Sequence, residues 1–84
     1  MIYLSKYLKS IQDRPGMYIG PETPANLETF IAGFDAAHPI DYVTPILRNR
    51  GVGSKGISGY DSFERAFQVA LEGAIEAEKL FDMS

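Results

Sequence analysis

Cysteine and tryptophan are absent from these 84 residues, and histidine occurs once, as His38. Without cysteine the chain has no disulfide framework and no thiolate metal site, and a single histidine excludes a nitrogen-rich metal site. No apolar run approaches the roughly 20 residues that span a bilayer. The first ten residues have no basic leader followed by an apolar core, so we expect no signal peptide. We therefore expect a cytoplasmic protein that binds no membrane, metal or cofactor.

Positive charge is also scarce. Eight Lys and Arg residues face 11 Asp and Glu residues, which gives a formal net charge of −3. This balance argues against a nucleic-acid-binding protein, because such proteins neutralise phosphates with cationic side chains. It suits a basic protein partner instead. Hydrophobic residues make up 45% of the chain, with five Phe and five Tyr, so we expect one folded domain over residues 1–84.

Two helices are predicted in the first half of the chain. Apolar residues at helical spacing predict a helix over 2–13, which ends at Arg14-Pro15 because the residue before a proline avoids the helical conformation. Thr23 as cap and Pro24 at the first position begin a second helix, over about 24–37. Gly33 lies inside this helix at a cost of about 1 kcal/mol relative to Ala. Such a glycine either marks the close approach of another backbone, as it often does, or has no special role.

The second half has one ambiguous segment and one long helix. Pro45 rules out a long helix through residues 42–50, and both a short helix from Thr44 and an edge strand over 42–44 fit. The glycine-rich residues 50–60 predict an exposed loop. Asp61 followed by Glu64 is typical of a capping box and begins the longest helix, over 61–81. The expected fold is all-α, with three to four helices and a Gly-rich loop before a long C-terminal helix.

The segment 14–20, Arg-Pro-Gly-Met-Tyr-Ile-Gly, is unusually apolar for a connection between helices. Pro15 and Gly16 favour a turn. We expect Met17 and Ile19 to fold under it into the core, while Tyr18 and Arg14 point outward or cap helix ends.

No residue pattern indicates catalysis. Residues 51–56 spell GxGxxG, but the dinucleotide fingerprint needs a preceding strand and a helix that opens directly on it. His38 lies near Asp35 and Asp41, yet no Ser or Lys is placed as a nucleophile, and a helix C-terminus is an ordinary place for a histidine. We expect that the protein is not an enzyme.

The acidic residues allow two interpretations. One group lies near the second helix, and another lies on the last helix at Glu72, Glu76 and Glu78. Each group forms either a solvated face or a docking surface for a basic protein. Aromatic side chains among charges are typical of protein–protein hot spots. The candidate partner-binding residues are Tyr18, Glu22, Glu28, Phe34, Asp35, Asp41, Tyr42 and Lys55.

The segment 14–20 resembles the N-terminal signature of the gyrase B and topoisomerase IV ATPase domain. That family carries a catalytic Glu and an Asp-Asn pair on the next helix. Aligned on Leu27, these positions are Gly33, Ala36 and Ala37, so the resemblance implies no ATPase activity. A nucleotide-binding remnant or regulator of that type remains one alternative function, and a small dimerising structural domain is another.

A second resemblance covers about the first half of the chain. A short helix, the segment 14–20 and a helix with the phrase Phe30-Ile-Ala-Gly33-Phe34 are similar to small bacterial immunity proteins. Those proteins accompany the toxins of contact-dependent growth inhibition and polymorphic toxin systems. The resemblance implies an antitoxin-like, cytoplasmic toxin inhibitor that occludes the active site of a cognate toxin domain, commonly a nuclease.

Overall fold

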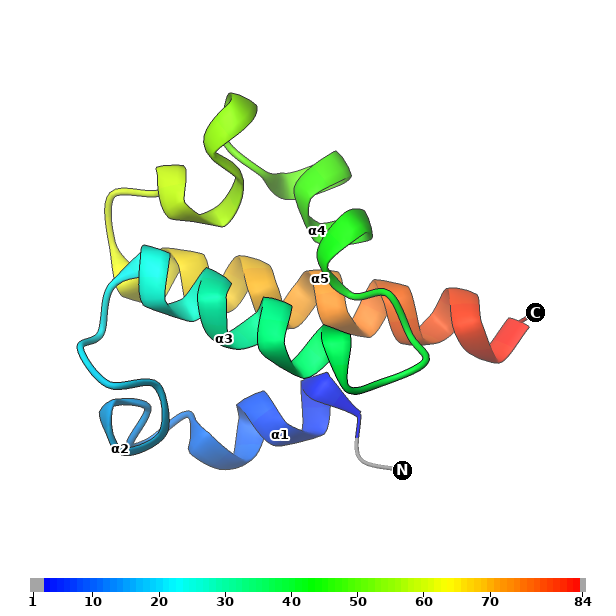
Figure 1. The fold of residues 1–84 in the computed structure, drawn as a ribbon, viewed down its shortest axis with the longest axis horizontal. Coiled ribbons are helices and arrows are strands. Elements are labelled where there is room, and N and C mark those ends of the chain that lie inside the picture. The colour runs from blue at the N-terminus through cyan, green and yellow to red at the C-terminus, as the bar shows by residue number, and fades with distance from the viewer. Residues whose placement is uncertain (1–2, 84) are drawn as a thin grey trace.

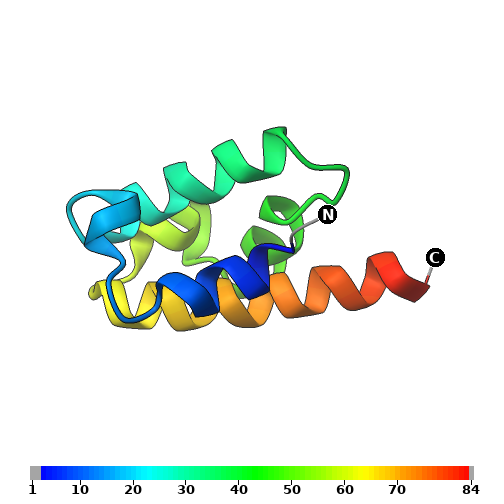
Figure 2. The same cartoon turned by 90° about the horizontal axis from the view of Figure 1, so that it is seen from below.

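The computed structural model describes residues 3–83, which form five α-helices and one 3₁₀ helix and contain no β-strand. The elements are α1 (Leu4–Ile11), α2 (Gly16–Ile19), α3 (Pro24–Ala36), α4 (Val43–Arg50), the 3₁₀ helix η1 (Gly53–Gly59) and α5 (Phe63–Met83). The long α5 contacts α1, α3, α4 and η1 (Figure 1). Figure 2 shows α3 and α5 on opposite sides of the molecule, with α1 between them in that view. The predicted all-α fold is confirmed.

The core lies where these helices meet α5. Alanines recur along the buried face of α5, and short side chains at such positions let neighbouring helices approach closely. Leucine and isoleucine side chains from the other elements fill the remaining space. The fully buried large side chains are Leu4, Leu8, Leu27, Ile31, Tyr42, Ile46 and Ile57.

The cap predicted for α3 is confirmed, and the one predicted for α5 is displaced by one residue. Thr23 accepts a hydrogen bond from the Asn26 N–H at 3.2 Å, and Pro24 is the first residue of α3. On α5 it is Ser62, not Asp61, whose Oγ accepts the Arg65 N–H at 3.2 Å. An N-cap side chain accepts the N–H of the second or third helical residue. Arg65 is the third residue of α5, so Ser62 is the N-cap and α5 begins at Phe63.

The ambiguous segment is a helix, so the edge-strand alternative is wrong. Pro45 is the third residue of α4, where its missing N–H removes no bond within the helix. Two aspartates stabilise the start of α4 from outside. Asp35 Oδ1 accepts the Tyr42 N–H at 2.7 Å, and Asp41 Oδ1 accepts the Thr44 N–H at 3.2 Å.

The glycine-rich segment is more ordered than the predicted exposed loop. Gly53–Gly59 forms η1, kinked at Gly56, which has a φ of 61° that other residues rarely adopt. The Val52 N–H donates to the Gly56 carbonyl at 3.0 Å and closes the kink. Ile57 is 1% exposed and belongs to the core. An apolar residue within the glycines thus anchors the segment to α3 and α5.

The segment 14–20 contains the single turn α2, and the orientation predicted for Met17 is wrong. Pro15 is buried and Ile19, four residues later, packs against the core, because residues at this spacing share a helix face. Met17 lies between them on the outer face and is 71% exposed. The outward directions predicted for Tyr18 and Arg14 are confirmed, as is the inward direction of Ile19.

Of the two possibilities left open for Gly33, the structure shows no close contact there, and the close helix contact lies at Gly73. A Cβ on Gly73 would collide with the side chain of Ile46, so the glycine lets α4 pack directly on α5. Gly33 is exposed, and no atom lies within 4 Å of the position that its Cβ would occupy.

Candidate functional site

An open pocket of about 380 Å³ lies where the end of α1 and the segment after it meet the first turns of α5. The chain places these parts together because α1 packs along α5 and Pro15 is buried where α1 gives way to α2. We call it the acidic pocket. Its lining residues are Gln12, Asp13, Pro15, Glu22, Phe63, Glu64, Phe67 and Gln68.

Three carboxylates on separate segments share this pocket. Asp13 follows α1, Glu22 follows α2 and Glu64 lies in the first turn of α5, and all three residues are exposed. No lysine or arginine lines the pocket, and within residues 3–83 the three carboxylates have no ion-pair partner. Like charges grouped in a concave site add their potentials, so the acidic pocket attracts cations.

The apolar part of the pocket is aromatic. Phe67 is 6% exposed and Phe63 is half-buried, with their ring centroids 5.8 Å apart. The face of a phenylalanine ring carries partial negative charge and attracts a guanidinium or ammonium group placed over it. A carboxylate rim beside phenylalanine rings therefore has the chemistry that pairs with a guanidinium or ammonium group and packs against its aliphatic stem.

Of the predicted partner-binding residues, only Glu22 lines the acidic pocket. Tyr18, on α2, lies between Pro15 and Glu22 in the chain and is 54% exposed. Its ring meets that of Tyr7 edge-on, with the centroids 6.4 Å apart. Tyr18 and Met17 thus form an exposed, apolar edge on the segment that connects two pocket residues.

Tyr18 is also one end of a row of aromatic rings between α1 and α3, which we call the aromatic strip. It consists of Tyr7, Tyr18, Phe30, Phe34 and His38. Phe34 is half-buried and stacks on His38 with 3.9 Å between ring centroids, and His38 Nδ1 lies 2.8 Å from the Phe34 carbonyl oxygen. His38 is therefore held at the C-terminal end of α3, as its sequence position predicts.

The exposed position predicted for Tyr42 is wrong. The sequence predicted an exposed aromatic anchor, but the Tyr42 side chain is fully buried. Its hydroxyl accepts the Leu4 N–H at 3.1 Å, and burial raises the pKa of Tyr42 to about 12. In the sequence Tyr42 lies at an ambiguous helix start. Nothing in the local pattern shows that the first residue of α1, Leu4, packs beside its hydroxyl.

The carboxylates of Asp35 and Asp41 accept hydrogen bonds from backbone N–H groups at the start of α4, so they do not form a free acidic surface. Asp41 is exposed, but its hydrogen bonds from Thr44 hold its pKa below the usual value of 3.8, and Arg48 acts in the same direction. Each carboxylate therefore has a structural role at the start of α4, which a local sequence pattern does not reveal.

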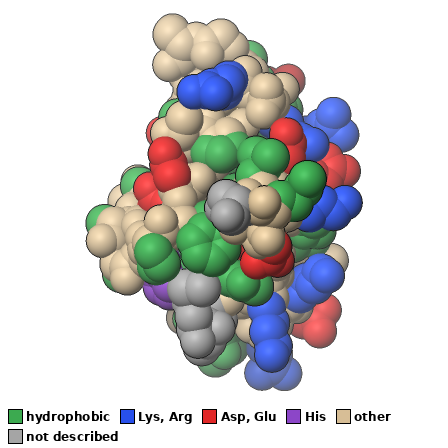
Figure 3. Space-filling view, turned by 90° about the vertical axis from the view of Figure 1, so that its right-hand side faces the viewer, with side chains coloured by type: hydrophobic (Ala, Val, Ile, Leu, Met, Phe, Trp, Pro, Cys, Tyr) green, Lys and Arg blue, Asp and Glu red, His purple; other side chains and the backbone are tan. Residues whose placement is uncertain are grey.

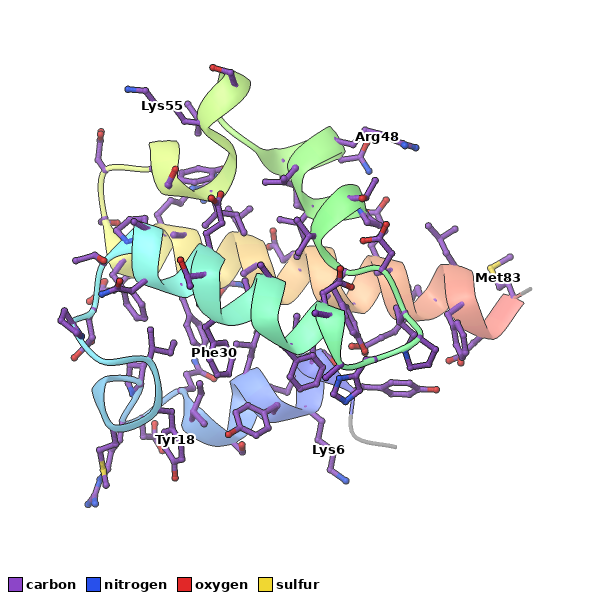
Figure 4. The ribbon with its side chains drawn as sticks, in the orientation of Figure 1. Lys6, Tyr18, Phe30, Arg48, Lys55 and Met83 are labelled. Carbon is purple, nitrogen blue, oxygen red and sulfur yellow. The ribbon has the colours of Figure 1, made fainter. Side chains whose placement is uncertain are left out.

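Glu28 and Lys55 belong to another part of the molecule. Glu28 Oε2 lies 3.4 Å from the Ser58 N–H, which ties α3 to η1. Lys55 is exposed on η1, and Figure 4 places it on the opposite side of the ribbon from Tyr18. The structure does not bring these two residues to the acidic pocket.

Asp13, Glu64 and the two phenylalanines are the acidic and aromatic pocket residues that the sequence did not indicate. Glu64 fits a capping box and Phe67 fits the core face of α5, so each had a sufficient local explanation. Glu78, grouped with exposed acids on the last helix, is 8% exposed, and Glu76 pairs with Arg50. The packing of α1 and α4 on α5 therefore decides which carboxylates of the last helix are buried, paired or free.

Residues 3–83 contain no group of three or more His, Cys, Asp or Glu side chains arranged to hold a metal ion. No helix in this range is long and apolar enough to cross a membrane. The GxGxxG run at 51–56 lies on the approach to η1 and within it, and α5 begins only at Phe63. Comparisons with protein-family models, curated proteins and solved structures find no match for this chain.

Proposed function

We propose that this protein is an immunity protein, a small toxin inhibitor that binds the active site of a cognate toxin domain through the acidic pocket. The resemblance of its first half to immunity proteins supports this class. The acidic pocket is the observation that carries the proposal, because it combines three unpaired carboxylates with phenylalanine rings in one concave site. We further propose that the toxin domain is a nuclease of basic charge.

The pocket suits such a toxin for a physical reason. Nucleases hold the phosphate backbone of their substrate with cationic side chains. An arginine or lysine from that surface, inserted between Glu22 and Glu64, exchanges phosphate for carboxylate partners of similar geometry. The toxin then loses a substrate contact, and the bound inhibitor excludes nucleic acid from the same surface.

Two further features favour this mode of binding. The net charge of −3 steers the protein toward a cationic surface, which raises the association rate at low salt. The exposed Met17 and Tyr18 lie on the segment that joins two sides of the pocket. Both residue types are enriched in protein interfaces, where they supply apolar contact around a central charge pair.

The proposal predicts that the gene immediately upstream encodes the cognate toxin domain, and inhibition of that domain is the test. The purified toxin domain is mixed with increasing amounts of the protein, and nuclease activity on plasmid DNA and on total RNA is measured. We expect activity to disappear at equal molar amounts, and the two proteins to co-elute in gel filtration. Full nuclease activity at a severalfold molar excess, with separate elution, contradicts the proposal.

A further inference from the structure

Glu22, one of the pocket carboxylates, belongs to the short connection between α2 and α3, and the backbone of this connection is closely held. In Figure 1 the connection lies at the left of the molecule, at the same end as the first turns of α5. The chain leaves α2 at Gly20, whose φ of 90° favours glycine. The Thr23 N–H then donates to the Pro21 carbonyl oxygen at 2.9 Å, so the backbone makes a tight turn at Glu22.

Asn26 binds both chain neighbours of Glu22. Its side-chain Nδ2 donates to the Pro21 carbonyl oxygen at 2.9 Å, and its backbone N–H donates to Thr23 Oγ1 at 3.2 Å. Asn26 is the third residue of α3, and the next residue, Leu27, is fully buried in the core. One residue of a packed helix therefore fixes the backbone on each side of Glu22.

The side chain of Asn26 is not needed to start α3. Asparagine is a weaker helix former than alanine, and the Thr23 side chain already caps the helix. In a capping box the residue at this third position is Glu or Gln, and its side chain returns to the N-cap N–H. Here the Thr23 N–H donates to Pro21 instead, and the Asn26 amide holds the carbonyl group directly before Glu22.

Gly16, the first residue of α2, leaves room for the side chain of Glu22. A Cβ on Gly16 would lie 3.2 Å from Glu22 Oε2 and 3.8 Å from Glu22 Cγ. Gly16 is not among the glycines with a positive φ, so its backbone conformation is open to other residues. The missing side chain therefore matters for space, and the Glu22 side chain lies against the backbone of α2.

No cationic side chain orients the Glu22 carboxylate. At the opposite end of the molecule, which faces the viewer in Figure 3, several Asp and Glu side chains lie beside Lys and Arg side chains. Lysine and arginine are missing from the lining of the acidic pocket, and Glu22 has no ion-pair partner within residues 3–83. The position of this carboxylate thus depends on the hydrogen bonds around it in the chain and on the space at Gly16, and its charge is left unpaired.

We infer that Asn26 is a positioning residue, which together with Gly16 holds the Glu22 carboxylate at the acidic pocket before a partner binds. This role rests on the proposed function, because Glu22 is there a contact for the cation of the toxin domain. An exposed glutamate loses rotamer freedom when it pairs with a partner. A carboxylate that is held in advance loses less, so Asn26 increases the affinity of the pocket without lining it.

Nuclear magnetic resonance of the protein alone tests the positioning. We expect a nuclear Overhauser effect between the Glu22 γ-protons and the Gly16 α-protons in the wild type, and its loss in Asn26→Ala. The order parameter of the Glu22 amide should fall from about 0.85 toward about 0.6. Thr29→Ala is the matched control, because it removes another side-chain hydrogen bond of α3, to the Ala25 carbonyl, and should change neither signal. An unchanged Glu22 contact in Asn26→Ala, or equal loss in both variants, overturns the inference.

Binding of the toxin domain that the proposal expects the upstream gene to encode tests the consequence. We expect Asn26→Ala to weaken binding about threefold or more, and to have no further effect in a Glu22→Gln background, because it acts only through that carboxylate. Equal weakening in both backgrounds would give Asn26 a purely structural role and overturn the inference. Absence of binding by the wild-type protein contradicts the proposed function instead, and the resonance measurement then decides the role of Asn26 alone.

Discussion

The Glu78 carboxylate, near the end of α5, accepts the backbone N–H of Ser5 in the first turn of α1 at 3.0 Å. The Ser5 hydroxyl also donates to Glu78. The residue that precedes α1, Tyr3, provides no side-chain cap, so a residue 73 positions away in the sequence satisfies this helix start. Glu78 thus joins the last helix to the first, and the Tyr42 hydroxyl, which accepts the Leu4 N–H, joins the start of α1 to the start of α4.

Replacement of this cap should therefore destabilise the fold. We expect Glu78→Gln to lower the free energy of unfolding by about 2 kcal/mol, because a charge-assisted hydrogen bond is lost inside the core. Urea denaturation measures the change. Glu72→Gln, on an exposed position of the same helix, is the matched control and should change stability by less than about 0.5 kcal/mol. Equal effects of the two substitutions would show that the buried contact contributes nothing.

Replacing each of the two glycines that lie within helices, Gly33 and Gly73, by alanine should change the stability in opposite directions. Gly73→Ala places a methyl group against Ile46 and should cost about 1–3 kcal/mol. Gly33→Ala places the same group in open space and should stabilise the monomer by up to about 1 kcal/mol. Thermal unfolding at low protein concentration separates the two, and a loss of stability in Gly33→Ala would contradict the open environment of Gly33.

Alkaline pH should weaken the fold through Tyr42. Its pKa is raised to about 12 in the folded protein, mainly by burial, against an ordinary value of 10.0. A raised pKa means that the contribution of Tyr42 to stability is complete below about pH 10 and is lost as the pH rises toward 12. The free energy of unfolding, measured from pH 8 upward, should fall less steeply in Tyr42→Phe than in the wild type. The Tyr3 pKa is also raised, chiefly by its hydrogen bond to Asp82, and contributes equally in both proteins. Parallel curves would exclude Tyr42 as the source.

Acidic pH should lower the stability of the fold through Asp41 at the start of α4. The hydrogen bonds from Thr44 lower the pKa of Asp41 below its ordinary value of 3.8. The contribution of Asp41 to the free energy of unfolding is therefore complete above pH 3.8 and is lost as the pH falls through the lowered pKa. Because Asp41 is exposed, the effect is at most about 1 kcal/mol. Stability measured from about pH 5 down to about pH 2 should depend less on pH in Asp41→Asn, and an unchanged acid dependence would argue against this role.

Helical spacing was sufficient to predict most of the helices of this fold. The apolar faces of α3 and α5 are long enough to specify a helix by themselves, and Thr23-Pro24 specifies where α3 begins. The single turn α2 is too short to have a periodic pattern, which explains the wrong direction predicted for Met17. The buried position of Ile57 depends on the contact of η1 with α3 and α5, and no local signal within the glycines contains that information.

The candidate site depended even more on tertiary structure. Glu22 was recognised as a possible contact because it is acidic, but Asp35 and Asp41 are equally acidic and cap α4 instead. Whether a carboxylate is free depends on which N–H group lies near it, and those N–H groups belong to other elements. Phe63 and Phe67 follow the core period, and only the open packing at the first turns of α5 makes them part of a pocket.

Calorimetric titration of the toxin domain that the proposal expects the upstream gene to encode, with Glu64→Lys and Glu72→Lys, is the most direct test of the acidic pocket. Both variants make the same charge change on exposed positions of α5, but only Glu64 lines the pocket. We predict that Glu64→Lys weakens binding at least about tenfold, because it opposes the entering cation, whereas Glu72→Lys weakens binding less than about threefold. Added salt should weaken wild-type binding more than that of Glu64→Lys. Equal affinities of the two variants would contradict the proposed role of the acidic pocket.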